Sequence, residues 1–155
     1  MQVPLKDIEV HAQTLLERLG QNQIARRAST DCAWLQAVGY PGLKILLEAT
    51  ADAVQSVALE KDLMGLDLQE VSCVFLADQI ADLYAEHGRM FLRNVRHGLY
   101  LVPMSVRGNY GIGCPVDPAF ALGGERTKNP YTEKIEIAER DGVLVDDDIW
   151  QQFQT

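Results

Sequence analysis

The feature that most constrains the fold is a helical spacing of apolar residues through the first part of the chain. Apolar residues recur at every third or fourth position in four runs, residues 5–19, 22–38, 42–56 and 68–87. This spacing places them on one face of a helix. Gly20, Gly39 and Gly88 follow three of the runs, in the position where helices commonly end. The pattern predicts four helices, and a fifth if residues 89–96 are helical rather than irregular.

Two clusters of polar residues resemble helix starts. Asp67 followed by Glu70 has the spacing of a capping box and predicts that the fourth helix begins at Leu68. The acidic run at residues 146–148 can cap a last short helix containing Ile149, Trp150 and Phe153. Short polar side chains accept hydrogen bonds from the first backbone N–H groups of a helix, which is why they predict these starts.

The period changes in the last third of the chain. Residues 99–106 form a continuous apolar and β-branched run that predicts a strand, at an edge or with a bulge because of Pro103. Residues 134–139 and 143–146 flank a turn at residues 140–142 and predict a hairpin. The expected fold class is therefore α+β, with a helical part followed by a small, mostly antiparallel sheet. We expect a single domain over residues 1–155, helical in 1–97 and β-containing in 98–155, with a long glycine- and proline-rich loop at 107–131.

Composition narrows the class of protein. The 155 residues carry a formal net charge of −8, which argues against nucleic acid and anionic membranes as partners. No apolar run is long enough for a transmembrane helix, and the N-terminus lacks the features of a secretory signal. The three cysteines are widely spaced without a C-x-x-C pair, which is typical of free thiols in a reducing compartment. We expect a cytoplasmic protein of bacterial type.

A positively charged stretch stands out against this acidic background. No acidic residue lies between Glu86 and Asp117, whereas four arginines do: Arg89, Arg93, Arg96 and Arg107. On a helix over 89–97 the first three would share one face. They could bind a carboxylate or phosphate, because the guanidinium group pairs bidentately with such anions. Alternatively, they form ion pairs with the abundant aspartates and glutamates, which is the commoner arrangement.

The glycines that follow suggest an anion-binding loop. Gly108, Gly111 and Gly113 resemble a phosphate-binding loop in composition, but their order is the reverse of the dinucleotide fingerprint. Pro115 and Pro118 oppose the helix that this fingerprint requires. A nest of backbone N–H groups remains open, as does a tight turn. The candidate ligand-binding residues are Arg93, Arg96, Arg107, Gly111 and Gly113.

A cysteine next to this loop is a candidate nucleophile. Cys114 could act as a thiolate, with His97 or Asp117 as the base or the orienting group. The alternative is a small buried hydrophobic residue, which is the commoner role of a free cysteine. The three histidines and three cysteines show none of the spacings of a metal site, so neither a metal nor another cofactor is expected.

Short stretches of the chain resemble a small family of uncharacterised bacterial proteins. They are Ala25-Arg26 through Trp34-Leu35, Gly39 to Leu43 and Leu99 to Pro103. The family is a domain of unknown function, so the resemblance implies no catalytic residues. Its longer members continue past the position of Thr155, which implies a further C-terminal element. The non-Rossmann malate and lactate dehydrogenases also begin with a helical hairpin, but their Ser-His-Gly element has no counterpart at Gly39 to Gly42.

Two functions are compatible with these patterns. The first is a homo-oligomeric module, most simply a homodimer, in which the glycine- and proline-rich stretch packs on a second copy. The second is a small protein or enzyme that binds an anionic metabolite around residues 108–117. We expect the first, with the second as the alternative.

Overall fold

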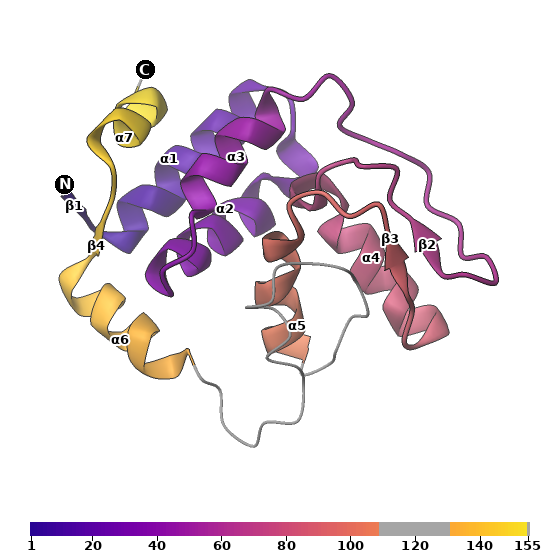
Figure 1. Cartoon of the computed structure of the whole chain (residues 1–155). Coiled ribbons are helices and arrows are strands. Elements are labelled where there is room, and N and C mark those ends of the chain that lie inside the picture. The colour runs from indigo at the N-terminus through magenta and orange to yellow at the C-terminus, as the bar shows by residue number, and fades with distance from the viewer. Residues whose placement is uncertain (109–130, 155) are drawn as a thin grey trace. The chain divides into compact units, whose positions relative to one another are not determined.

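The computed structural model describes residues 1–108 and 131–154, and these residues are mainly helical (Figure 1). The described helices are α1 (Leu5–Arg18), α2 (Asn22–Ala37), α3 (Gly42–Thr50), α4 (Cys73–His87), α5 (Val102–Gly108), α6 (Thr132–Asp141) and α7 (Asp147–Gln154), with a 3-10 helix, η1, at Gly98–Leu101. The described strands are β1 (Gln2–Val3), β2 (Leu66–Asp67), β3 (Leu92–Arg93) and β4 (Val143–Leu144). They form two sheets of two strands each. The predicted α+β class is therefore wrong, and the fold is mainly helical.

The described residues fall into two compact units. Unit 1 contains residues 1–51 and 131–154, with α1, α2, α3, α6, α7 and the β1–β4 pair. Unit 2 contains residues 52–108, with α4, α5, η1 and the β2–β3 pair. The single-domain organisation of the chain stays a prediction.

The core of unit 1 is a helical hairpin. Ile8, Ala12 and Leu16 of α1 are fully buried, as are Ala28 and Leu35 of α2. These residues lie at the helical spacing that the sequence displays, so burial of one apolar stripe on each helix stabilises the pair. The first two predicted helices are confirmed within a residue at their ends.

Glycine 42 explains how α3 follows α2 so closely. A Cβ atom at Gly42 would lie 2.6 Å from the carbonyl oxygen of Cys32, so only glycine allows this approach. The third helix ends at Thr50, earlier than the predicted end at residue 56. Residues 52–108, which follow α3, belong to unit 2.

The C-terminal strands of the prediction are helices in the structure. Residues 99–106 lie in η1 and α5, and Pro103 occupies the first turn of α5, where a missing N–H breaks no intrahelical hydrogen bond. Residues 134–139 lie within α6, and Gly142, with a φ of 75°, ends that helix instead of turning a hairpin. The short apolar run at residues 99–106 fits a buried helix as well as a strand, so periodicity alone could not separate them. In residues 134–139, Ile135 and Ala138 also have the i, i+3 spacing of a helix face.

The predicted strand at residues 143–146 is partly correct. Val143 and Leu144 do form a strand, β4, but its partner is β1 at the other end of the chain. The short helix predicted after the acidic run is confirmed as α7. The Asp146 side chain accepts hydrogen bonds from the backbone N–H groups of Asp148 and Ile149, at 3.0 and 3.2 Å, which is the expected cap.

Unit 2 is built on a parallel β2–α4–β3 connection. The predicted start of α4 at Leu68 is wrong, because the helix begins at Cys73 with Ser72 as its N-cap. The Ser72 hydroxyl accepts a hydrogen bond from the Val74 N–H at 3.2 Å. Asp67 instead lies in the extended strand β2, and the backbone N–H of Glu70, a residue with a φ of 60°, donates to the Asn94 carbonyl. Asp67 and Glu70 therefore do not form the predicted capping box.

Candidate functional site

The backbone of unit 2 adopts unusual conformations next to the β2–β3 pair. Hydrogen bonds link Leu68 N–H to the Arg93 carbonyl, at 2.9 Å, and Glu70 N–H to the Asn94 carbonyl, at 3.0 Å. Four residues here other than glycine have positive φ, namely Gln69, Glu70, Asn94 and His97. Such conformations carry a free-energy cost and concentrate at functional positions. This region is therefore a candidate position for a functional site.

One carboxylate holds the two strained segments together. Oδ1 of Asp67 accepts hydrogen bonds from the Gln69 N–H at 2.9 Å and from the Asn94 side-chain amide at 2.8 Å. The Asn94 hydrogen bond, followed by that of Gln69, lowers the pKa of Asp67 below its usual value, because both favour the charged form. The Asp67 contacts stabilise a local turn and leave no sign of a reactive group.

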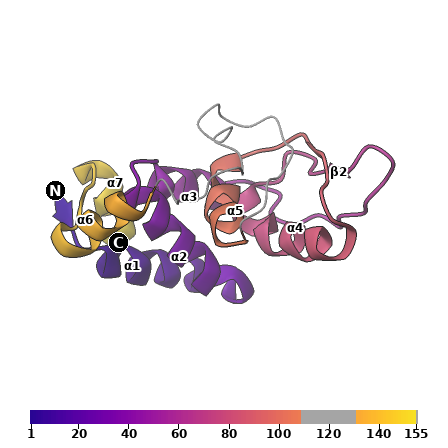
Figure 2. The same ribbon diagram turned by 90° about the horizontal axis from the view of Figure 1, so that it is seen from below.

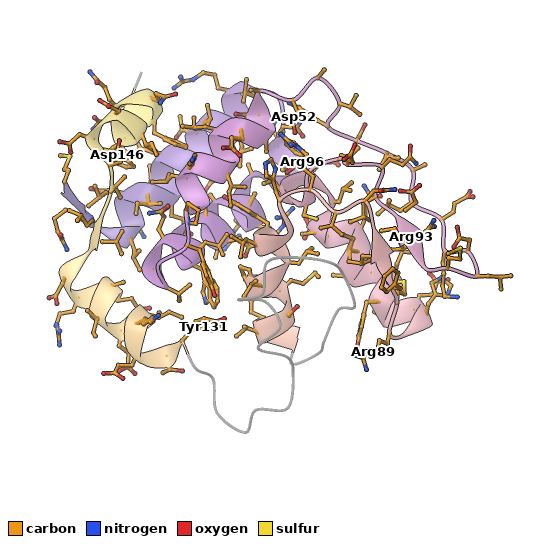
Figure 3. The ribbon with its side chains drawn as sticks, in the orientation of Figure 1. Asp52, Arg89, Arg93, Arg96, Tyr131 and Asp146 are labelled. Carbon is orange, nitrogen blue, oxygen red and sulfur yellow. The ribbon has the colours of Figure 1, made fainter. Side chains whose placement is uncertain are left out.

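Two of the three predicted ligand-binding arginines are engaged in ion pairs. Nε and Nη2 of Arg96 donate to the two carboxylate oxygens of Asp52 at 2.9 and 3.0 Å. Nη2 of Arg93 donates to Oδ2 of Asp62 at 3.0 Å. Figure 3 shows the Arg96 side chain directed toward Asp52. These two arginines therefore match the alternative that the sequence left open, ion pairs with acidic residues of the chain.

The arginines do not converge on one helical face. Residues 92 and 93 form β3 rather than part of a helix. Arg89 is exposed in the connection between α4 and β3, and Arg107 is exposed in the last turn of α5. Gly111 and Gly113, the other candidate ligand-binding residues, lie outside the described residues.

His97 is paired with a serine that the sequence analysis did not single out. Its Nδ1 lies 2.7 Å from the hydroxyl of Ser72. A serine and a histidine at this distance resemble a nucleophile and its base. However, Ser72 is fully buried and its hydroxyl also caps α4, so the pair has a structural role. Its sequence signal was the position of a serine just before an apolar helical run. Cys114 and Asp117, the other catalytic candidates, lie outside the described residues.

The two ion pairs hold the ends of one extended segment, which we call the clasped segment (residues 52–62). Arg96 binds its first residue, Asp52, and Arg93 binds its last, Asp62. Both arginines come from the chain in and after β3, three residues apart. These two ion pairs, which we call the clasp, thus fix an irregular stretch of unit 2 to a short stretch of backbone. That backbone is itself tied to α4 through the hydrogen bond from the Cys73 N–H to the Arg96 carbonyl.

The middle of the clasped segment has the character of an unpaired strand. In the described structure, residues 56–61 take part in no backbone–backbone hydrogen bond. Their burial alternates, since Val57 and Leu59 are half-buried whereas Ser56, Ala58 and Glu60 are exposed. A period of two is that of an extended strand with one face against the protein. The loop before β2 stands clear of α4 in both views (Figure 1, Figure 2).

Large apolar side chains are exposed where the clasped segment ends. We call Leu63, Met64 and Phe91 the apolar corner; their exposed fractions are 104, 66 and 56%. A tight turn places the first two, because the Asp62 N–H donates to the Gly65 carbonyl and the Met64 N–H donates to the Asp62 carboxylate. Gly65 packs against the Phe91 backbone, which brings the third side chain to the same end of the β2–β3 pair. Val54, within the clasped segment, is also exposed.

The described residues hold no candidate metal centre. Across residues 1–108 and 131–154, no group of three or more histidine, cysteine, aspartate or glutamate side chains is arranged to hold a metal ion. None of the helices in that part of the chain is long and apolar enough to cross a membrane.

Comparison with family models, with curated proteins and with solved structures finds no match to this chain. The resemblance to a domain of unknown function therefore stays a prediction. Among the described residues, the clasped segment with the apolar corner is the candidate functional site.

Proposed function

We propose that this protein is a homo-oligomeric module that associates through the apolar corner and the clasped segment. The observation that carries the proposal is the exposure of Leu63, Met64 and Phe91 at one end of the β2–β3 pair. Scattered exposed apolar residues are ordinary, but a cluster beside open backbone is typical of an interaction surface. Other copies of the same chain are present wherever the protein is, so a second copy is the simplest partner.

The free energies involved are of the right order for a dimer. Full burial of one large apolar side chain contributes about 1.5–3 kcal/mol. Two copies of the apolar corner supply six such side chains. The loss of translational and rotational freedom on association costs about 4–15 kcal/mol, which burial of that extent can offset.

The ion pairs of Arg93 and Arg96 favour this function over the capture of a small anion at those two side chains. Each guanidinium group already binds a carboxylate of the same chain. An incoming metabolite would have to displace Asp62 or Asp52 and leave that carboxylate without its partner. In the proposed module the same pairs hold the clasped segment in place for association.

The test is sedimentation velocity of the full chain over a wide range of concentrations, with a matched pair of variants. The double variant Leu63→Glu, Phe91→Glu is expected to stay monomeric at concentrations where the parent protein forms dimers, because each glutamate would be desolvated at the interface. Val10→Glu is the control, since Val10 is an exposed apolar residue of α1 in unit 1. A parent protein that is monomeric at high micromolar concentration contradicts the proposal.

The proposal also includes a cytoplasmic location. Cys32 and Cys73 are buried thiols, which agrees with a reducing compartment. Alkylation of freshly extracted, denatured protein is expected to label both residues. Protection of either one as a disulfide would contradict this location.

A further inference from the structure

The open backbone of residues 56–61 can receive a partner strand. An extended segment with unpaired N–H and C=O groups is a template for the addition of another strand, because main-chain hydrogen bonds form whatever the side chains are. The half-buried faces of Val57 and Leu59 keep the segment against unit 2, and Asp52 and Asp62 are bound at its ends. The segment is therefore already extended before a partner binds, which lowers the entropy cost of pairing.

We propose that residues 56–61 pair antiparallel with the same residues of a second copy, with Ala58 of each chain opposite Ala58 of the other. This inference rests on the proposed function, because it names the contact through which the two copies of the module associate. The two paired segments would form a two-stranded sheet that spans the two-fold axis.

Symmetry and side-chain chemistry select the register. A two-fold axis perpendicular to the plane of the paired strands keeps each side chain on its own face of the sheet. Residues whose numbers are both odd or both even therefore lie opposite each other. With Ala58 at the axis, Val57 opposes Leu59 twice, and Ser56 opposes Glu60. Apolar pairs of this kind stabilise neighbouring strands, and no like charges lie opposite each other.

The adjacent registers are less favourable. With Val57 at the axis, Leu59 opposes Gln55 and Glu60 opposes Val54. With Leu59 at the axis, Val57 opposes Lys61. Each alternative sets an apolar side chain against a polar or charged one, so neither forms the two Val57–Leu59 pairs.

The aspartates that flank residues 56–61 do not oppose a second copy as the occupant. Asp52 and Asp62 are each paired with an arginine of their own chain, and Glu60, within the segment, lies opposite Ser56 in the proposed register. The strand that approaches therefore meets no unneutralised aspartate at those positions, although the chain as a whole carries a net charge of −8. Two copies of this short strand can therefore pair without repulsion between those aspartates.

Disulfide cross-linking tests the register directly. Ala58→Cys is expected to form a covalent dimer under mild oxidation, because the two cysteines would face each other across the axis at a separation suited to a disulfide. Ala53→Cys is the matched control, since Ala53 is exposed in the same segment. In the proposed register the two copies of residue 53 lie about 33 Å apart along the strands. Both variants carry Cys114→Ser so that the added cysteine is compared on one background.

The expected result is a cross-linked fraction roughly tenfold larger for Ala58→Cys than for Ala53→Cys. Sedimentation of the reduced proteins distinguishes a failure of the strand pairing from a failure of the proposed function. If the protein is a dimer but the two variants cross-link equally, or neither does, strand pairing at Ala58 is wrong while the module stands. If the protein stays monomeric, the proposed function itself fails.

Hydrogen exchange provides a second readout that needs no substitution. Alternate amides in residues 56–61 are expected to become protected as the concentration of the protein rises through the dimerisation range, because every second N–H of a strand points to its neighbour. Unchanged fast exchange of all of these amides in a proven dimer would overturn the pairing.

Discussion

At the scale of single residues, two arginines have roles that only their partners reveal. Arg93 and Arg96 belong to the cationic stretch that the sequence displays, yet each binds an aspartate distant in the chain. The Arg96–Asp52 pair is bidentate and half-buried, with exposed side-chain fractions of 42 and 22%. Such geometry makes it the stronger of the two ends of the clasp.

A double-mutant cycle measures the strength of this pair. Asp52→Asn is expected to lower the free energy of unfolding by about 1 kcal/mol, because a bidentate, charge-assisted contact is lost in a half-exposed setting. The same change in the Arg96→Gln background should cost much less. Asp82→Asn, at an exposed position of α4, is the control. Equal effects in both backgrounds would mean that the two side chains do not stabilise each other.

At the scale of elements, glycines decide where the chain can turn and approach itself. Gly65 has a φ of 97° and lies so close to Phe91 that an added Cβ would clash with its carbonyl oxygen. Gly20, after α1, has a φ of 79° but nothing within 4 Å of the same added atom. The first glycine is required by conformation and by space, the second by conformation alone.

Alanine at these two positions should separate the two requirements. Gly20→Ala is expected to destabilise the protein by about 1–2 kcal/mol, the cost of the left-handed conformation. Gly65→Ala should cost more, about 3 kcal/mol or above, because the β2–β3 pair must also move apart. Chemical denaturation of both variants measures the difference. Similar losses would show that the approach of Gly65 to Phe91 relaxes at little cost.

At the scale of the whole molecule, net charge opposes the proposed association. Two copies that each carry a net charge of −8 repel one another, and salt screens that repulsion. The contacts proposed between the copies are apolar or between backbone groups. Added salt therefore weakens the repulsion but does not weaken these contacts.

The dissociation constant of the dimer is therefore expected to fall several-fold as sodium chloride is raised from low to moderate concentration. Sedimentation equilibrium at a series of salt concentrations measures it. Dissociation on addition of salt would instead show that ion pairs between the copies hold the assembly, contrary to the apolar interface proposed.

The sequence alone determined the helices α1 to α3 and α7 because their signals are local. An apolar stripe at helical spacing and a short polar cap need only a few neighbouring residues to specify them. Even so, the exact end of α3 and the start of α4 depended on contacts made elsewhere. Leu66 and Asp67 pair with Leu92 and Arg93, and that pairing delays α4 until Ser72 can cap it.

Tertiary structure decided what local pattern could not. Residues 99–106 and 134–139 are compatible with helix or strand, and packing made them helical. The strand β4 pairs with β1, at the opposite end of the chain. The candidate site follows the same rule. The cationic stretch was visible in the sequence, but its partners Asp52 and Asp62 were not, because ion pairs depend on distances in space. Likewise, the apolar corner exists only because folding leaves those three side chains exposed while it buries others like them.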